Sequence, residues 1–204
     1  NTTSMNWKLL IAFLTISSLV NAQGVTKYEV SFSNYIHHEA TIRISFPAKG
    51  NVALKMSRSS PGRYATHEFG KNVYDVKAWD SATGKTVAVK QKEGDTYAIA
   101  YTSGILVVEY ILFADHVDGT YAGIDRTHAH LNMPASFMWV VGRDAYPIQV
   151  RFNAPQGSGW KVATQLVPGK DAFSFSAPNL QYFMDSPTEL SDFKLRSWTL
   201  KDTD

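Results

Sequence analysis

The chain has 204 residues, of which 44% are hydrophobic and 19% are charged, a composition typical of one globular domain with a sizeable core. The formal net charge is +2 and no run of Lys or Arg stands out, so nucleic acid is not expected as a partner. Cysteine is absent, which excludes disulfides, cysteine nucleophiles and thiolate zinc sites. Aromatic residues make up 13% of the chain, and this share favours β structure.

The N-terminus has the three-part pattern of a secretory signal peptide. A short, positively charged start precedes the apolar stretch Leu9–Val20, and small residues lead to a cleavage site after Ala22. The apolar stretch is shorter than the roughly 20 residues of a transmembrane helix. We therefore expect residues 1–22 to hold extraneous residues followed by the signal peptide Met5–Ala22. Residues 23–204 would form the mature domain, secreted or periplasmic and not bound to a membrane.

The first part of the mature chain alternates between apolar and polar residues. Residues 28–33, 39–46 and 52–56 all show this period of two, which predicts strands with one buried face. The short polar connection Asn34–His38 joins the first two runs. The sequence therefore predicts an antiparallel hairpin here.

The middle of the chain continues with short apolar runs between turn signals. Residues 80–85 form one turn cluster and Glu93–Asp95 another, and Ser103–Gly104 gives a further turn signal before the next run. The run Ile105–Phe113 is nearly continuously apolar, which is typical of a strand buried on both faces. Residues 146–152 and 160–166 predict two more strands.

One helix signal lies late in the chain. Ser186 suits an N-cap, Pro187 the first helical position and Glu189 the third, so a short helix or turn is predicted there. Residues 193–198 then predict a further strand. Together the elements predict an all-β fold, an antiparallel β-sandwich or strongly bent sheet, with one short helix near the C-terminus.

The chain lacks the patterns of common hydrolases. His38-Glu39 and His67-Glu68 each begin the helical zinc motif His-Glu-x-x-His, but neither has the second histidine. A Gly-x-Ser-x-Gly motif is also absent. We therefore assign no catalytic residue, no metal ligand and no cofactor to this chain.

A looser polar cluster allows two interpretations. It comprises His116, Asp118, Asp125, His128 and His130. Two histidines on one strand face are compatible with zinc, which would suggest a small metal-dependent enzyme. The alternative is a polar loop whose histidines donate to backbone carbonyls.

Three sequence blocks appear together in a distinctive order. The first, residues 56–73, combines a strand with Pro-Gly-Arg-Tyr and then an acidic residue, Phe, Lys, Asn and Val. The second is residues 118–132, with the sequence DGTYAGIDRTHAHLN, and the third is residues 177–190. Over residues 25–195 this order resembles the N-terminal domain of glycyl aminopeptidases, secreted or cytosolic zinc peptidases that often carry a C-terminal PDZ module.

The resemblance implies a non-catalytic domain of an aminopeptidase that removes small N-terminal residues such as Gly or Ala. Zinc and the catalytic Glu of that family lie downstream, in a catalytic domain that this chain does not reach. The implied partners are the protein's own catalytic domain and the peptide substrate of the parent. An apolar surface left without its partner domain also predicts weak self-association.

Within the three blocks, six polar or aromatic residues are candidates for contact with substrate or with the catalytic domain: Arg63, Tyr64, Asp125, Arg126, His130 and Asn132. A Pro-Gly turn at residues 61–62 would fix the direction in which the first two leave the sheet. Each candidate also admits a structural interpretation, either as a residue that fixes a turn to the sheet or as part of a buried ion pair. The alternative function is a free-standing carbohydrate- or peptide-binding β-sandwich module, which exposed coplanar aromatic rings would support.

Overall fold

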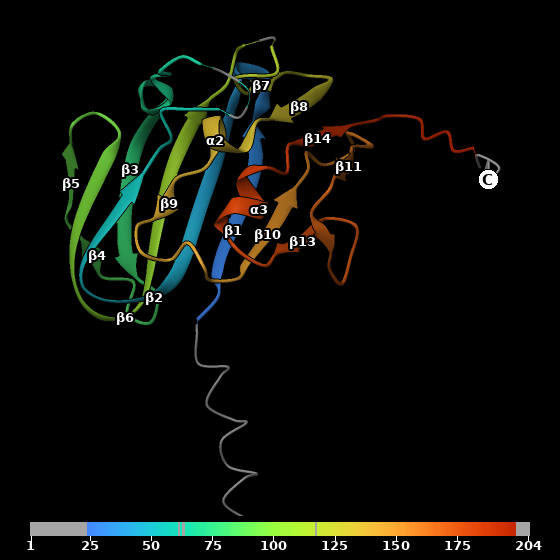
Figure 1. The fold of residues 1–204 in the computed structure, drawn as a ribbon. Helices are drawn as coiled ribbons and strands as arrows, with labels where there is room; N and C mark the ends of the chain where they lie inside the picture. Colours follow the sequence, from blue (N-terminus) through green and yellow to red (C-terminus); the bar gives the residue numbers. More distant parts are fainter. Residues whose placement is uncertain (1–23, 61, 63, 117, 199–204) are drawn as a thin grey trace, which may run out of the picture.

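The computed structural model describes residues 24–60, 62, 64–116 and 118–198 (Figure 1). The predicted signal peptide Met5–Ala22 lies outside the described residues. None of the helices in the described part is long and apolar enough to span a membrane. In chain order the elements are β1 (Thr26–Asn34), the 3-10 turn η1 (Tyr35–His37), β2 (Glu39–Lys55), the 3-10 turn η2 (Phe69–Asn72), β3 (Val73–Asp80), β4 (Thr86–Val87), β5 (Val89–Lys92), β6 (Thr96–Phe113), β7 (Gly123–Ile124), β8 (His128–Leu131), α2 (Met133–Ser136), β9 (Trp139–Val140), β10 (Ile148–Asn153), β11 (Lys161–Thr164), β12 (Val167–Pro168), β13 (Ser174–Ala177), α3 (Leu180–Met184) and β14 (Thr188–Ser191).

The larger of two sheets has ten strands in the order β12-β13-β10-β1-β2-β6-β3-β4, with β5 paired to β6 and β9 to β2. Its buried face follows the predicted alternation, since Tyr28, Val30 and Phe32 on β1 are all buried. Strands β1 and β2 form the predicted antiparallel pair. Strands β1 and β10 are parallel, and this pairing requires a long crossover connection.

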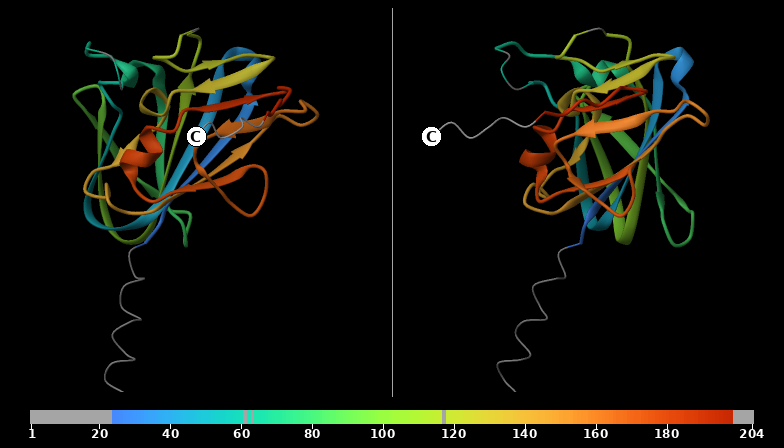
Figure 2. Two further views of the ribbon diagram at one scale, coloured as in Figure 1. Left: turned by 45° about the vertical axis from the view of Figure 1, so that its right-hand side comes forward. Right: turned by 90° about the vertical axis from the view of Figure 1, so that its right-hand side faces the viewer.

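A smaller sheet, in the order β11-β14-β8-β7, and the helices α2 and α3 cover one face of the larger sheet (Figure 2). The Tyr28 ring stacks on Phe183 of α3 at 5.0 Å and meets Phe137 edge-on at 5.4 Å. Phe32 and Trp160 meet at 5.7 Å near the start of β11. Burial of each such side chain stabilises the fold by about 1.5–3 kcal/mol. The predicted all-β class, with a short helix near the C-terminus, is confirmed.

The two longest strands, β2 and β6, pair antiparallel along their whole length and form the centre of the larger sheet, although residues 56–95 separate them in the chain. The turn predicted at Ser103–Gly104 is wrong, because β6 runs through this point without a break. The irregularity appears instead as a register shift between Lys49, which pairs with Ser103, and Gly50, which pairs with Tyr101. Gly104, with φ of +130°, pairs with Ala48 beside it. In the predicted doubly buried run only residues 106–108 are buried consecutively, and alternation resumes at Glu109.

Two buried tyrosines fix the segment after α2 to the larger sheet. The Tyr110 hydroxyl donates to the Ser136 carbonyl at 2.8 Å and accepts from the Met138 N–H at 3.0 Å. The Tyr28 hydroxyl donates to the Met138 carbonyl at 2.8 Å. Burial raises the pKa of both phenols above the ordinary value. Both hydroxyls therefore stay neutral and satisfy backbone groups in the core.

Two predictions near the C-terminus are wrong in detail. The helix does not begin at Ser186 but spans α3, because the Asn179 side chain accepts from the Tyr182 N–H at 2.9 Å and caps that earlier segment. Residues 188–191 form β14 instead. Residues 193–198, predicted as a strand, have no strand partner in the described part of the chain.

Candidate functional site

A long loop, residues 57–68, connects β2 to η2 and carries the first two candidate contacts. Arg63 lies outside the described residues. Tyr64 projects fully into solvent, with a relative exposure of 106%. The base of the loop is closed by a hydrogen bond from the His67 N–H to the Arg58 carbonyl at 2.8 Å. Tyr64 therefore projects from a loop whose two ends are joined by a backbone hydrogen bond.

Asn132 lies where β8 ends and α2 begins, and its side chain points inward. The amide donates to Ser60 Oγ at 2.9 Å and to the Thr120 carbonyl. All three residues are buried. One side chain thus links residue 132 to two separate loops, residues 57–68 and 118–122. We call these two loops together with Asn132 the contact loops.

An aromatic cluster holds the two contact loops together at a second point. His67 stacks on Phe69 at 5.0 Å, with an angle of 10° between the rings. Tyr121 meets the edges of both rings, at 5.6 Å and 5.1 Å. His116 packs against the other side of Tyr121 at 4.4 Å. The loops are therefore fixed relative to each other as well as to the sheet.

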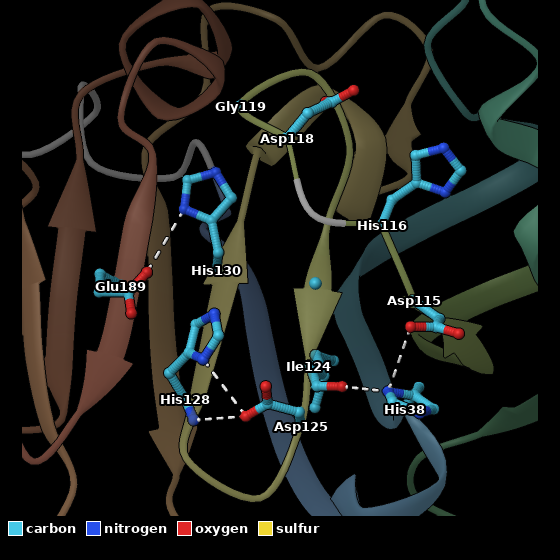
Figure 3. Close-up of a pocket in the computed structure, with 11 residues that line it drawn as sticks. His38, Asp115, His116, Asp118, Gly119, Ile124, Asp125, His128, His130 and Glu189 are labelled. Atoms are coloured by element: carbon cyan, nitrogen blue, oxygen red, sulfur yellow. Dashed lines mark hydrogen bonds and ion pairs between the residues drawn. The ribbon is translucent and has the colours of Figure 1, made fainter.

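Beside the contact loops lies a hollow of about 350 Å³ that gathers titratable side chains from distant parts of the sequence (Figure 3). Loop residues Asp118 and Gly119 form part of its wall, so the hollow adjoins the contact loops. The side chains come from β8, β14, the β6–β7 connection, the β7–β8 turn and the residue after η1. The titratable residues are His38, Asp115, His116, Asp118, Asp125, His128, His130 and Glu189.

Three of the four histidines of the hollow, His38, His128 and His130, make contacts through Nδ1. His130 Nδ1 lies 3.4 Å from Glu189 Oε2 on β14, and its Nε2 is buried without a hydrogen-bond partner. His38 Nδ1 hydrogen bonds to the Ile124 carbonyl at 2.6 Å and lies 3.6 Å from Asp115. These contacts tie together the small sheet, the β6–β7 connection and the end of the first hairpin.

Asp125 organises the turn between β7 and β8. Its Oδ1 accepts from the Thr127 N–H at 2.6 Å, the Thr127 hydroxyl at 2.7 Å and the His128 N–H at 3.0 Å, and lies 3.2 Å from His128 Nδ1. Partial burial raises the pKa of Asp125, but the hydrogen bonds from Thr127 and His128 outweigh it and lower the pKa to about 2. Arg126 is exposed at the tip of the same turn.

The hollow does not have the geometry of a metal centre. Among the described residues, no group of three or more His, Asp or Glu side chains is arranged to hold a metal ion. The imidazoles are used in pairwise contacts with carboxylates and a carbonyl. The structure therefore gives no support to a small metal-dependent enzyme built on residues 116–130, and these residues do not fit zinc.

The structure brings the candidate residues into two adjoining groups. Asp125 and His130 face the hollow with Arg126 on the turn beside it, while Tyr64 and Asn132 belong to the contact loops. Sequence reasoning missed the partners Ser60, Thr120 and Glu189, and it missed His38, which lines the same hollow. His38 was considered only as the start of a helical zinc motif, and the pairing of Glu189 with His130 depends on the order of β8 and β14.

One solved structure shares this fold over most of the chain, and two others score lower. An aminopeptidase N family protein from Idiomarina loihiensis superposes with a TM-score of 0.80 at 20% identity, covering 86% of this chain and 30% of that chain. An M1 zinc metallopeptidase from Deinococcus radiodurans gives 0.48 at 9% identity, covering 81% and 41%. Leukotriene A4 hydrolase from Saccharomyces cerevisiae gives 0.49 at 11% identity, covering 82% and 28%.

The chain therefore spans about a third of the length of the Idiomarina protein. No curated protein sequence matches it. A family model does match, that of the Peptidase M61 N-terminal domain, over residues 27–192. This range includes all three sequence blocks that resemble an aminopeptidase N-terminal domain. The chain belongs to the Peptidase M61 N-terminal domain family.

Proposed function

We propose that this domain packs on the catalytic domain of a zinc aminopeptidase and forms one wall of the cleft that receives the N-terminus of a peptide. The parent enzyme would prefer small N-terminal residues such as Gly or Ala. Its zinc ligands and general base would lie in the catalytic domain, where the metal polarises the scissile carbonyl and activates water. The residues of this chain would position that domain and the substrate.

The observation that carries the proposal is the way the contact loops present Tyr64. A fully exposed tyrosine projects from a loop whose base is closed by a backbone hydrogen bond and anchored by Asn132 through Ser60. Tyrosine supplies a large amphipathic contact surface at low cost in side-chain entropy, and it is enriched at interfaces. An exposed tyrosine between two such anchor points, Ser60 and His67, suits contact with a second domain or with peptide.

The alternative of a carbohydrate-binding module has less support. Four aromatic side chains of the described residues are substantially exposed, namely Tyr64, Tyr74, Phe113 and Trp198. None of them forms a ring pair with another of the four. The described surface therefore lacks the platform of neighbouring rings on which a sugar would stack.

The test of the proposed function is Tyr64→Ala in the natural full-length protein and in the 204-residue chain. In the full-length protein we expect kcat/KM for Gly- and Ala-terminated peptides to fall about tenfold or more, the effect of losing an interface anchor. In the chain alone the free energy of unfolding should stay within about 0.5 kcal/mol, because an exposed residue has few contacts. Tyr74→Ala, at an exposed tyrosine on β3, is the matched control. Unchanged kinetics in the Tyr64 variant would contradict the proposal.

We also propose that the protein is exported through the signal peptide Met5–Ala22. The charged start, the apolar stretch and the small residues before Gln23 support this proposal. N-terminal sequencing of the mature protein should then give Gln23 as the first residue. A mature chain that retains the apolar stretch Leu9–Val20 would contradict it.

A further inference from the structure

Strand β14 ends at Ser191, at the edge of the small sheet where both of its antiparallel neighbours begin. Ser191 pairs with His128, the first residue of β8, and with Lys161, the first residue of β11. Residues 192–198 pair with no strand in the part of the chain that the structure describes. Figures 1 and 2 show residues 192–198, in red, leaving the body of the domain after β14. The segment 193–198 therefore continues an interior strand of the small sheet beyond the sheet itself.

The direction of this segment is set at its base by Lys161. The Lys161 ammonium lies 5.0 Å from the centre of the Phe193 ring and 3.5 Å from Asp192 Oδ1. It also donates a hydrogen bond to the Phe193 carbonyl. One side chain thus makes contacts with a ring, a carboxylate and a carbonyl. The segment leaves the domain from this fixed point.

The segment carries two large apolar side chains that contact little of the domain. Leu195 is 84% exposed and Trp198 is 79% exposed. Their neighbours Lys194 and Arg196 are exposed as well. Apolar residues alternating with cations at 193–196 are a strand pattern, as the sequence predicted. A strand with free edges is a template for pairing with another chain segment or domain.

We propose that residues 193–198 add as a strand to the peptidase domain that follows this one and bury Leu195 and Trp198 there. This inference rests on the proposed function. The family model ends at residue 192, so the segment lies immediately outside the N-terminal domain proper. The chain also covers only 30% of the similar Idiomarina protein, which leaves ample chain for a following domain in a protein of that size.

Amide hydrogen exchange of residues 193–198 tests the inference, with the natural full-length protein compared with the 204-residue chain. We expect exchange in the full-length protein to be slower by about tenfold or more, because strand amides become hydrogen bonded. Leu195→Ser should raise the exchange rate of the segment about tenfold, since it removes a buried anchor. Lys194→Ser introduces the same residue at the adjacent charged position and should change the rate by less than about twofold.

Fast exchange of residues 193–198 in the full-length protein would overturn the inference. If Tyr64 and the residues after it are protected while residues 193–198 are not, the proposed domain packing stands and only the added strand fails. If neither region is protected, the proposed function fails as well. Residues 193–198 could instead be protected in the isolated 204-residue chain, with protection that rises with protein concentration. That result would identify a second copy of the chain as the pairing partner, which also overturns the inference.

Discussion

Asn132 donates a hydrogen bond to Ser60 Oγ at 2.9 Å, although the two residues are 72 positions apart in the sequence. The same amide donates to the Thr120 carbonyl, so one side chain fixes two loops that have little regular structure of their own. All three groups are buried and have no ready access to water. The position of the contact loops therefore depends on Asn132 more than on any secondary-structure element.

Asn132→Ala should destabilise the chain by about 1–3 kcal/mol, because it leaves two buried acceptors without their donor. Urea unfolding gives the free-energy change directly. Asn153→Ala is the matched control, since its amide makes only a 3.3 Å contact with Ser31 on the exposed side of the sheet. Its effect should stay within about 0.5 kcal/mol. Equal effects of the two substitutions would show that the Asn132 amide does not hold the loops.

The two buried phenols predict a loss of stability at alkaline pH. Burial raises the pKa of Tyr28 and Tyr110 in the folded state, whereas an unfolded tyrosine titrates near pH 10. Their contribution to stability is therefore fully present below about pH 10 and is lost as pH rises above it. Tyr110→Phe should make this alkaline decline shallower and should also cost about 1–3 kcal/mol at neutral pH, because the Met138 N–H and Ser136 carbonyl lose their partner.

Urea unfolding at several pH values between 8 and 11 measures both effects. Tyr64→Phe, at a fully exposed tyrosine, is the comparison and should leave the alkaline slope unchanged. The prediction fails if Tyr110→Phe leaves the alkaline slope of the wild-type protein unchanged.

The hydrogen bonds that Asp125 accepts predict that the free energy of unfolding decreases at acid pH. The pKa of Asp125 is lowered to about 2 in the folded state, below the ordinary value of 3.8. Its contribution is therefore present above about pH 4 and is lost as pH falls towards 2. Because the side chain is 45% exposed, solvent screening limits the contribution to about 0.5 kcal/mol. Asp125→Ala should make the decline in unfolding free energy between pH 4 and pH 2 shallower, and an unchanged profile would contradict this account.

Gly104 is required by the backbone conformation of β6 where this strand pairs with β2. Its φ is +130°, and a Cβ at this position would lie 2.8 Å from the Tyr101 hydroxyl. Gly104→Ala should therefore destabilise the chain by about 1–3 kcal/mol through backbone strain and steric contact. Gly119→Ala is the matched control, because a Cβ there meets nothing within 4 Å. Thermal unfolding measures both, and a Gly104 variant as stable as the Gly119 variant would show that the backbone relaxes without cost.

The strands that alternate along the chain were predictable, whereas pairings between distant segments were not. Tyr28, Val30 and Phe32 gave β1 its buried face in the sequence and in the structure. Ser103–Gly104 looked like a turn, because a glycine inside a strand and a glycine in a turn give the same local signal. The parallel pairing of β1 with β10 joins segments far apart in the chain, and local periodicity carries no information about it.

The candidate site was predictable to a similar extent. Asp125 and His130 were identified, and the structure places both at the hollow. The pairing of His130 with Glu189 depends on the neighbouring strands β8 and β14, so it required the fold. Asn132 was proposed as a contact residue, yet its amide is turned inward, because two buried acceptors from distant loops meet there.

The most direct test of the central claim is an aminopeptidase assay of two proteins with Gly- and Ala-terminated peptides. The account predicts no turnover by the 204-residue chain, because it assigns the zinc ligands and the general base to the catalytic domain. It predicts turnover by the natural full-length protein that stops on chelation and returns with zinc. Zinc-dependent turnover by the 204-residue chain alone would contradict the account.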